Sequence, residues 1–115
     1  MLTKGFNQGD RFRHFKKHVL RRANISAADE ISYEAMADNF LGQSRQPSMF
    51  ECTRAGGDRI RFDCKTDEYG ICDSGGFIRT YFKPEAAVHG LPTNFHYMCQ
   101  ECRTVFPPNG VKQVI

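Results

Sequence analysis

The sequence contains no run of apolar residues approaching the eighteen or so that span a membrane, which argues against an integral membrane protein. It does not open with a basic stretch, an apolar core and a small-residue cleavage site, so we expect no signal peptide. It also shows no internal repeat and no low-complexity tract. What it has is 115 residues, 40% hydrophobic and 25% charged, an ordinary globular balance. We therefore expect a single domain, residues 1–115, too small for a multi-step enzyme with a dinucleotide cofactor.

Acidic residues are missing from one stretch and concentrated in the next. Residues 11–22 contain six Lys or Arg, two His and no acid, whereas residues 29–38 contain four acids and no base. A positive patch beside an acidic one is typical of a polyanion site or an oriented protein interface. A solvated helix face is the alternative interpretation.

The five cysteines are odd in number, which argues against a fully paired disulfide framework. Cys99 and Cys102 form a Cys-x-x-Cys with His96 three residues earlier, but a structural zinc site usually has two such knuckles. A metal would have to recruit Cys64 or Cys72 as well. The default expectation is thiols in a reducing compartment or one C-terminal disulfide.

Two helices are expected first. Residues 11–22 have helical spacing, with Phe12, Phe15 and Val19 on the side expected to be buried. The opposite side carries His14, Lys17, His18 and Arg21. A second helix is expected to begin at Ser26, with Asp29 completing an approximate capping box, and to end at Gly42.

After the second helix the period changes to two, which predicts short strands at 49–54, 59–63, 69–73 and 77–83. Ala-Gly-Gly-Asp at 55–58 is a tight hairpin signal, and Pro84 ends the last strand. Two helices followed by a four-stranded antiparallel meander predict an α+β fold with the helices on one face of the sheet. The other face or the rim is left for a ligand. The segment from about residue 85, which carries the last cysteines, is expected to be irregular.

The two histidines of the first helix have three interpretations. They could ligate a metal, although Lys17 and Arg21 would repel a cation. They could be plain surface residues. They could also be acid–base groups for phosphodiester cleavage, because imidazole titrates near neutrality and the neighbouring cations favour its neutral form.

The strand at 77–83 supplies a second cluster. Strand alternation places Phe77, Arg79 and Tyr81 on one face, with Thr80 on the other unless a bulge intervenes. Arg79 would suit a phosphate clamp, and Tyr81 a hydrogen-bond donor or a stacking surface for a base. The alternative is that one face is core and the other is solvated.

An ordered set of motifs that includes these clusters resembles that of a known family. The set comprises His14-Phe-Lys-Lys-His18, a helix bearing Tyr33, Thr53-Arg54 with Gly57-Asp58, Tyr69-Gly, and Gly75-Gly-Phe-Ile-Arg-Thr-Tyr-Phe-Lys-Pro84. Over about residues 12–97 it resembles the C-terminal toxin domains of bacterial polymorphic and contact-dependent growth inhibition toxins. Those domains are similar to barnase/EndoU/colicin/RelE-like ribonucleases, in which N-terminal helices pack on a four-stranded antiparallel sheet. The Cys99/Cys102 tail departs from this pattern.

The resemblance implies a metal-independent endoribonuclease that needs no cofactor. It implies a domain secreted as part of a larger toxin protein, acting in the cytoplasm of competing bacteria on RNA, with transfer RNA as one candidate. A cognate immunity protein, expected to be acidic because of the basic helix, would neutralise it. We expect the domain itself to be a monomer.

Together these arguments predict which residues carry the chemistry. A histidine takes the proton of a ribose 2′-hydroxyl, which attacks the adjacent phosphate, while cations and hydroxyls stabilise the phosphoryl oxygens. The predicted catalytic residues are His14, His18, Arg79, Thr80 and Tyr81. The predicted substrate-binding residues are Lys17, Arg21, Arg54 and Lys83.

Two other classes stay open at this point. A zinc-knuckle or nucleic-acid-binding module would explain the basic helix and the Cys-x-x-Cys without catalysis. A deoxyribonuclease toxin would normally carry a metal-binding set, for which Asp58 and Asp63 are thin candidates.

Overall fold

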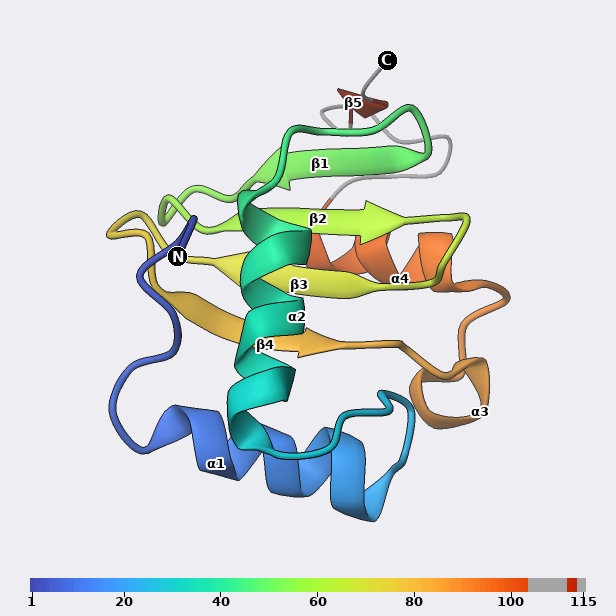
Figure 1. The fold of residues 1–115 in the computed structure, drawn as a ribbon. Helices are drawn as coiled ribbons and strands as arrows, with labels where there is room; N and C mark the ends of the chain where they lie inside the picture. The colour runs from blue at the N-terminus through green and yellow to red at the C-terminus, as the bar shows by residue number, and fades with distance from the viewer. Residues whose placement is uncertain (104–111, 114–115) are drawn as a thin grey trace.

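A computed structural model describes residues 1–103 and 112–113 of the chain (Figure 1). Five strands form one antiparallel sheet in the order β4-β3-β2-β1-β5. Their bounds are β1 Met49–Thr53, β2 Arg59–Asp63, β3 Tyr69–Cys72, β4 Ile78–Phe82 and β5 Lys112–Gln113. The four predicted strands are therefore present, and the α+β prediction is confirmed. The short strand β5, which pairs with β1, was not predicted.

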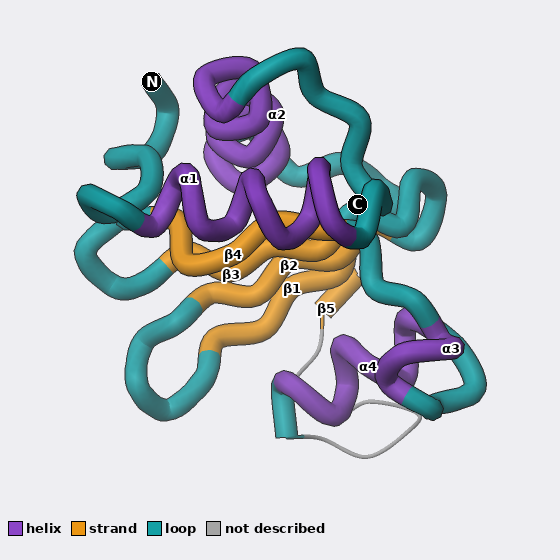
Figure 2. The backbone as a smooth tube through the Cα atoms, turned by 90° about the horizontal axis from the view of Figure 1, so that it is seen from below, coloured by secondary structure: helices purple, strands orange, loops and turns teal. Residues whose placement is uncertain are grey.

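The helices lie on both faces of the sheet rather than on one. They are α1 Asp10–Phe15, the π-helix η1 Lys16–Arg21, α2 Glu30–Gly42, α3 Ala86–His89 and α4 Asn94–Glu101. Helix α2 crosses one face, α4 packs on the opposite face, and the continuous helix α1–η1 runs along β4 (Figures 1 and 2). Across the described residues no helix is long and apolar enough to cross a membrane.

The expectation of an irregular segment from about residue 85 is wrong, because α3 and α4 lie there. Thr93 caps α4 by accepting a hydrogen bond from the backbone N–H of His96 at 3.1 Å. Met98 and Cys99 of α4 are buried, and Met98 packs with core residues of the sheet. The last part of that predicted segment, residues 104–111 and 114–115, lies outside the described residues.

Helix α2 contributes Tyr33, Ala37, Phe40 and Leu41 to the core on its face of the sheet. Its N-cap is Asp29, whose side chain accepts from the backbone N–H of Ser32 at 2.7 Å, so the helix begins four residues later than predicted. Tyr33 and Leu41 are fully buried. A Cβ at Gly70 of β3 would lie 3.0 Å from Leu41 Cδ2, so the glycine permits this close approach.

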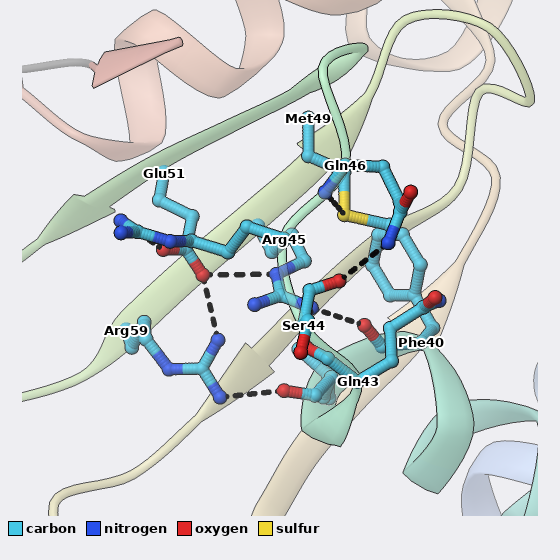
Figure 3. Close-up of polar contacts among 10 residues, drawn as sticks. Phe40, Gln43, Ser44, Arg45, Gln46, Met49, Glu51 and Arg59 are labelled. Atoms are coloured by element: carbon cyan, nitrogen blue, oxygen red, sulfur yellow. Dashed lines mark hydrogen bonds and ion pairs between the residues drawn. The ribbon is translucent and has the colours of Figure 1, made fainter. Parts of the chain in front are cut away.

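A buried charge cluster holds the end of α2 on the sheet (Figure 3). Glu51 of β1 accepts hydrogen bonds from Arg61 Nε at 2.9 Å and Arg59 Nη1 at 2.7 Å. Arg61 also donates to the carbonyl of Phe40 at 2.7 Å, and Arg59 donates to that of Leu41 at 2.7 Å. Burial alone would raise the pKa of Glu51, but the two arginine hydrogen bonds outweigh it and hold that pKa below its ordinary value. The guanidinium groups thus satisfy carbonyls that the helix end leaves open.

Strand β4 contains an irregularity that decides where its side chains point. Ile71 of β3 pairs with Thr80, but the next residue, Cys72, pairs with Ile78, which leaves Arg79 unpaired. Ile78 and Tyr81 consequently both face α2, whereas Thr80 faces the other side. The predicted alternation is correct after the bulge and wrong before it.

A disulfide joins strand β1 to the residue that follows α4. Cys52 of β1 is bonded to Cys102, which follows α4, while Cys64, Cys72 and Cys99 are free. The bond closes a loop with a sequence separation of 50 residues. It therefore fixes α4 covalently to the sheet.

We predict that Cys102→Ser lowers the free energy of unfolding by up to roughly 4 kcal/mol, the chain-entropy value for a loop of this length. Chemical denaturation without reductant measures the loss, and adding a reductant to the wild type should reproduce it. Cys64→Ser, which replaces an exposed free thiol, is the matched control and should leave stability unchanged. Identical transitions for all three proteins would contradict the prediction.

Candidate functional site

A pocket of about 290 Å³ lies where β4 ends and the chain turns into α3. Its size is at the lower end of the range for ligand pockets, about 300–1,000 Å³. It is lined by His14, Lys17, His18, Arg22, Asn24, Tyr69, Ile71, Thr80, Phe82, Lys83, Glu85, Val88, Tyr97 and Glu101. The site therefore draws on the first helix, the sheet face opposite α2, and the C-terminal helices.

The π-helical segment turns His18 into this pocket. Helical spacing of 100° per residue placed Phe12 in the core and His18 on the exposed face, but Phe12 is 54% exposed and His18 is 3% exposed. In η1 the hydrogen bonds span five residues, as in the 2.9 Å bond from the backbone N–H of Arg22 to the carbonyl of Lys17. The wider turn changes the angular position of each following side chain. Phe15 and Val19 do lie against the core, as predicted.

Stacked rings fix the two histidines. The His18 ring lies flat on Phe82, with centroids 4.6 Å apart and planes 5° apart. His14 stacks on His18 at 5.7 Å, and Phe6 stacks on His14 at 5.5 Å. The imidazoles are therefore part of a packed column and not mobile surface groups.

Both histidines are held neutral. Burial, with a smaller contribution from nearby cations, lowers the pKa of His14 to about 4. Burial, the neighbouring His14 and Lys17 lower the pKa of His18 to about 3. The Nδ1 atom of each is buried with no hydrogen-bond partner among the described residues, so Nε2 is the nitrogen left to meet a ligand.

The pocket is lined by three cations and two carboxylates, and one carboxylate, Glu85, follows Lys83 closely in the chain. Lys17, Arg22 and Lys83 are exposed and line it on the side of η1 and β4. Glu101 lines it on the side of α4 and makes an ion pair with Arg54 at 3.9 Å. Three exposed cations around a neutral imidazole can bind an anion and leave the imidazole free to accept a proton.

Five of the nine predicted site residues line the pocket: His14, Lys17, His18, Thr80 and Lys83. The other four lie elsewhere in the described part of the chain. Arg79 donates to Asp58 at 2.7 Å, and Arg54 donates to the same carboxylate at 2.8 Å. Tyr81 is fully buried under α2 with its hydroxyl bonded to Glu68, and Arg21 is exposed on η1.

The sequence argument missed the wall made by α4. Tyr97 and Glu101 come from this helix, and Tyr69 comes from β3 behind it. A signal was present, because Thr93 is a preferred N-cap residue and Met98 and Cys102 follow with helical spacing. The proline and glycine residues of the same segment obscure this pattern.

The cysteine and aspartate sets do not assemble a metal site. The sulfur of Cys102 is bonded to Cys52, and burial raises the pKa of the Cys99 thiol. Asp58 and Asp63 stand at opposite ends of β2, about 16 Å apart at the rise of an extended strand. In residues 1–103 and 112–113 no group of three or more His, Cys, Asp or Glu is placed to hold a metal ion.

No protein-family model matches the chain, and no curated protein matches it. The residues of the pocket are therefore the basis for the function proposed below.

We predict that acid destabilises the fold through His18. Between pH 6.5 and about 3 the unfolded chain binds a proton at this residue that the native ring does not, so the free energy of unfolding falls as pH falls through that window. The expected slope is about 1.4 kcal/mol per pH unit for one such histidine. Urea denaturation at several values between pH 7 and pH 5 measures it.

Two variants separate titration from packing. His18→Phe keeps a flat ring on Phe82 and removes the titrating group, so its unfolding free energy should fall less steeply with acid. Phe82→Leu weakens the same contact and keeps the histidine, so its slope should equal that of the wild type. Equal slopes in all three proteins would show that His18 is not held neutral.

Proposed function

We propose that this chain is a metal-independent endoribonuclease. The observation that carries the proposal is the convergence of a neutral, immobilised His18 with Thr80 and three exposed cations in one pocket. An imidazole can act as a general base, and the cations can hold the phosphate that it serves.

The cleavage would use the ribose 2′-hydroxyl as the nucleophile. His18 Nε2 takes the proton of this hydroxyl, and the oxygen attacks the adjacent phosphorus. Binding of the phosphodiester anion raises the pKa of the imidazole from its low resting value, because a nearby negative charge favours the protonated ring. The base thus gains strength when substrate arrives. The products are a 2′,3′-cyclic phosphate and a 5′-hydroxyl, and DNA is excluded because it has no 2′-hydroxyl.

The phosphate ligands differ from those expected from the sequence. Lys17, Arg22 and Lys83 line the pocket, whereas Arg79 is paired with Asp58 outside it. We therefore assign the phosphoryl oxygens to these three cations and to the hydroxyl of Thr80. His14, stacked behind His18, would hold the orientation of the base.

The biological setting follows from the sequence resemblance. We propose that the domain is the C-terminal toxin part of a larger secreted protein, which cleaves RNA in the cytoplasm of competing bacteria. An acidic immunity protein would inhibit it by covering the cations of the first helix. Arg13, Lys16, Lys17, Arg21 and Arg22 are all exposed there.

We predict that the protein degrades total RNA in excess chelator and leaves DNA intact. His18→Gln should reduce RNA cleavage by at least about a hundredfold, the usual contribution of a general base. Lys83→Ala should weaken cleavage through lost phosphate binding. Gel assays on refolded RNA and duplex DNA, with mass analysis of the product ends, measure these effects.

Arg79→Ala serves as the control for charge removal, since its guanidinium pairs with Asp58 and does not line the pocket. It should change the rate less than threefold. Cleavage of DNA that stops with chelator would overturn the proposal, as would full activity in a folded His18→Gln protein.

For the inhibitor, we predict an association rate that falls steeply with ionic strength, because opposite charges steer the encounter. Stopped-flow mixing with the acidic immunity protein at increasing salt measures the slope. A double variant, Lys16→Gln with Arg21→Gln, should reduce both the rate and its salt dependence. An association rate that ignores salt would place the inhibitor on another surface.

A further inference from the structure

The cleavage step proposed above does not yet name the group that protonates the departing oxygen. The oxygen that departs from phosphorus is an alkoxide unless an acid protonates it, and general acids contribute about a hundred- to ten-thousand-fold to such steps. Both histidines are neutral in the free pocket, so neither brings this proton. With the three cations assigned to the phosphoryl oxygens, the tyrosine hydroxyls are the candidate donors.

The hydroxyls of the four tyrosines can be compared directly. Tyr33 donates to the carbonyl of Tyr81, and Tyr81 donates to Glu68. The Tyr69 hydroxyl is buried and has no partner in the described structure. Tyr97 alone lines the pocket with a hydroxyl that is neither sealed in the core nor hydrogen-bonded to any residue described.

The Tyr97 ring is held by its neighbours. It stacks on His89 at 4.9 Å and meets Tyr69 at 5.2 Å and Phe82 at 6.3 Å. Phe82 is also the ring on which His18 lies, so the base and the phenol pack against one common side chain. Both residues also line the same pocket.

The environment of Tyr97 favours the protonated form of its phenol hydroxyl. Burial and the nearby Glu101 carboxylate raise the pKa of this phenol above its ordinary value. It is therefore protonated at neutral pH. A phenol remains far more acidic than an alcohol, so transfer of its proton to a departing alkoxide is downhill.

We propose that Tyr97 is the general acid of this site, an inference that rests on the ribonuclease function proposed above. The bond between the 2′-oxygen and phosphorus forms as His18 takes the hydroxyl proton. The bond between phosphorus and the 5′-oxygen breaks, its electron pair stays on that oxygen, and the proton of the Tyr97 hydroxyl is transferred to it. The phenolate then regains a proton through solvent from the His18 imidazolium, which restores both groups.

The test compares two substrates that differ in their need for this proton. A dinucleoside monophosphate has an alkoxide leaving group, whereas a ribonucleoside 3′-(4-nitrophenyl phosphate) has one that departs without protonation. Tyr97→Phe keeps the ring and should lower kcat on the dinucleotide by about a hundredfold, with kcat on the nitrophenyl ester within threefold of the wild type. Arg79→Ala, which changes a side chain outside the pocket, should leave both rates within about threefold of the wild-type values.

Each outcome supports or overturns the assignment. Equal losses on both substrates would mean that Tyr97 holds the substrate or the fold and is not the acid. No loss on either substrate would also overturn it, while leaving the ribonuclease function intact. A wild-type protein that cleaves neither substrate would overturn the ribonuclease function and this assignment together. Near-ultraviolet circular dichroism of the Tyr97→Phe protein confirms that it is folded.

Discussion

The contact between the His18 ring and Phe82 is the interaction on which the pocket depends. It joins the N-terminal helix to the edge of the sheet, with ring centroids 4.6 Å apart. Two departures from regular structure make it possible. The π-helical turn brings His18 inward, and the bulge at Arg79 sets the facing of Thr80 and Phe82. Each departure is local, yet the composition of the pocket follows from the two together. Segments of π-helix are often found at functional sites, and this one acts by orienting a titratable group.

The parts of the fold that the sequence predicts are those set by neighbouring residues. The strands and the 55–58 hairpin were found because alternation and turn residues act within a few positions. The start of α2 was misplaced because Ser26 and Asp29 are both good N-cap residues, and only the tertiary packing selects Asp29. The π-helix and the bulge have no such local signature. They are selected by packing, and so the burial of His18 is not predicted from the sequence.

The candidate site was predicted in part for a related reason. His14, Lys17, His18, Thr80 and Lys83 carry the right chemistry and do line the pocket. Arg54 and Arg79 carry equally suitable charges, but Asp58 accepts hydrogen bonds from both. Asp58 pairs with the cations that the hairpin brings close to it in the folded chain. The order of residues in the sequence does not show which cations these are. The same holds for Tyr97, whose proposed role depends on the positions of the four tyrosine hydroxyls in the folded chain.

The Cys52–Cys102 bond also changes the topology of the chain. In the oxidised state the chain is a closed ring with a sequence separation of 50 residues, from which two tails extend. Fully extended, the segment inside that ring would be roughly 170 Å long. The disulfide prevents this segment from being extended. An oxidised chain cannot thread a narrow channel as a single strand, because the ring enters doubled. For any route that passes the polypeptide in extended form, oxidation therefore has to follow passage, or reduction has to precede it.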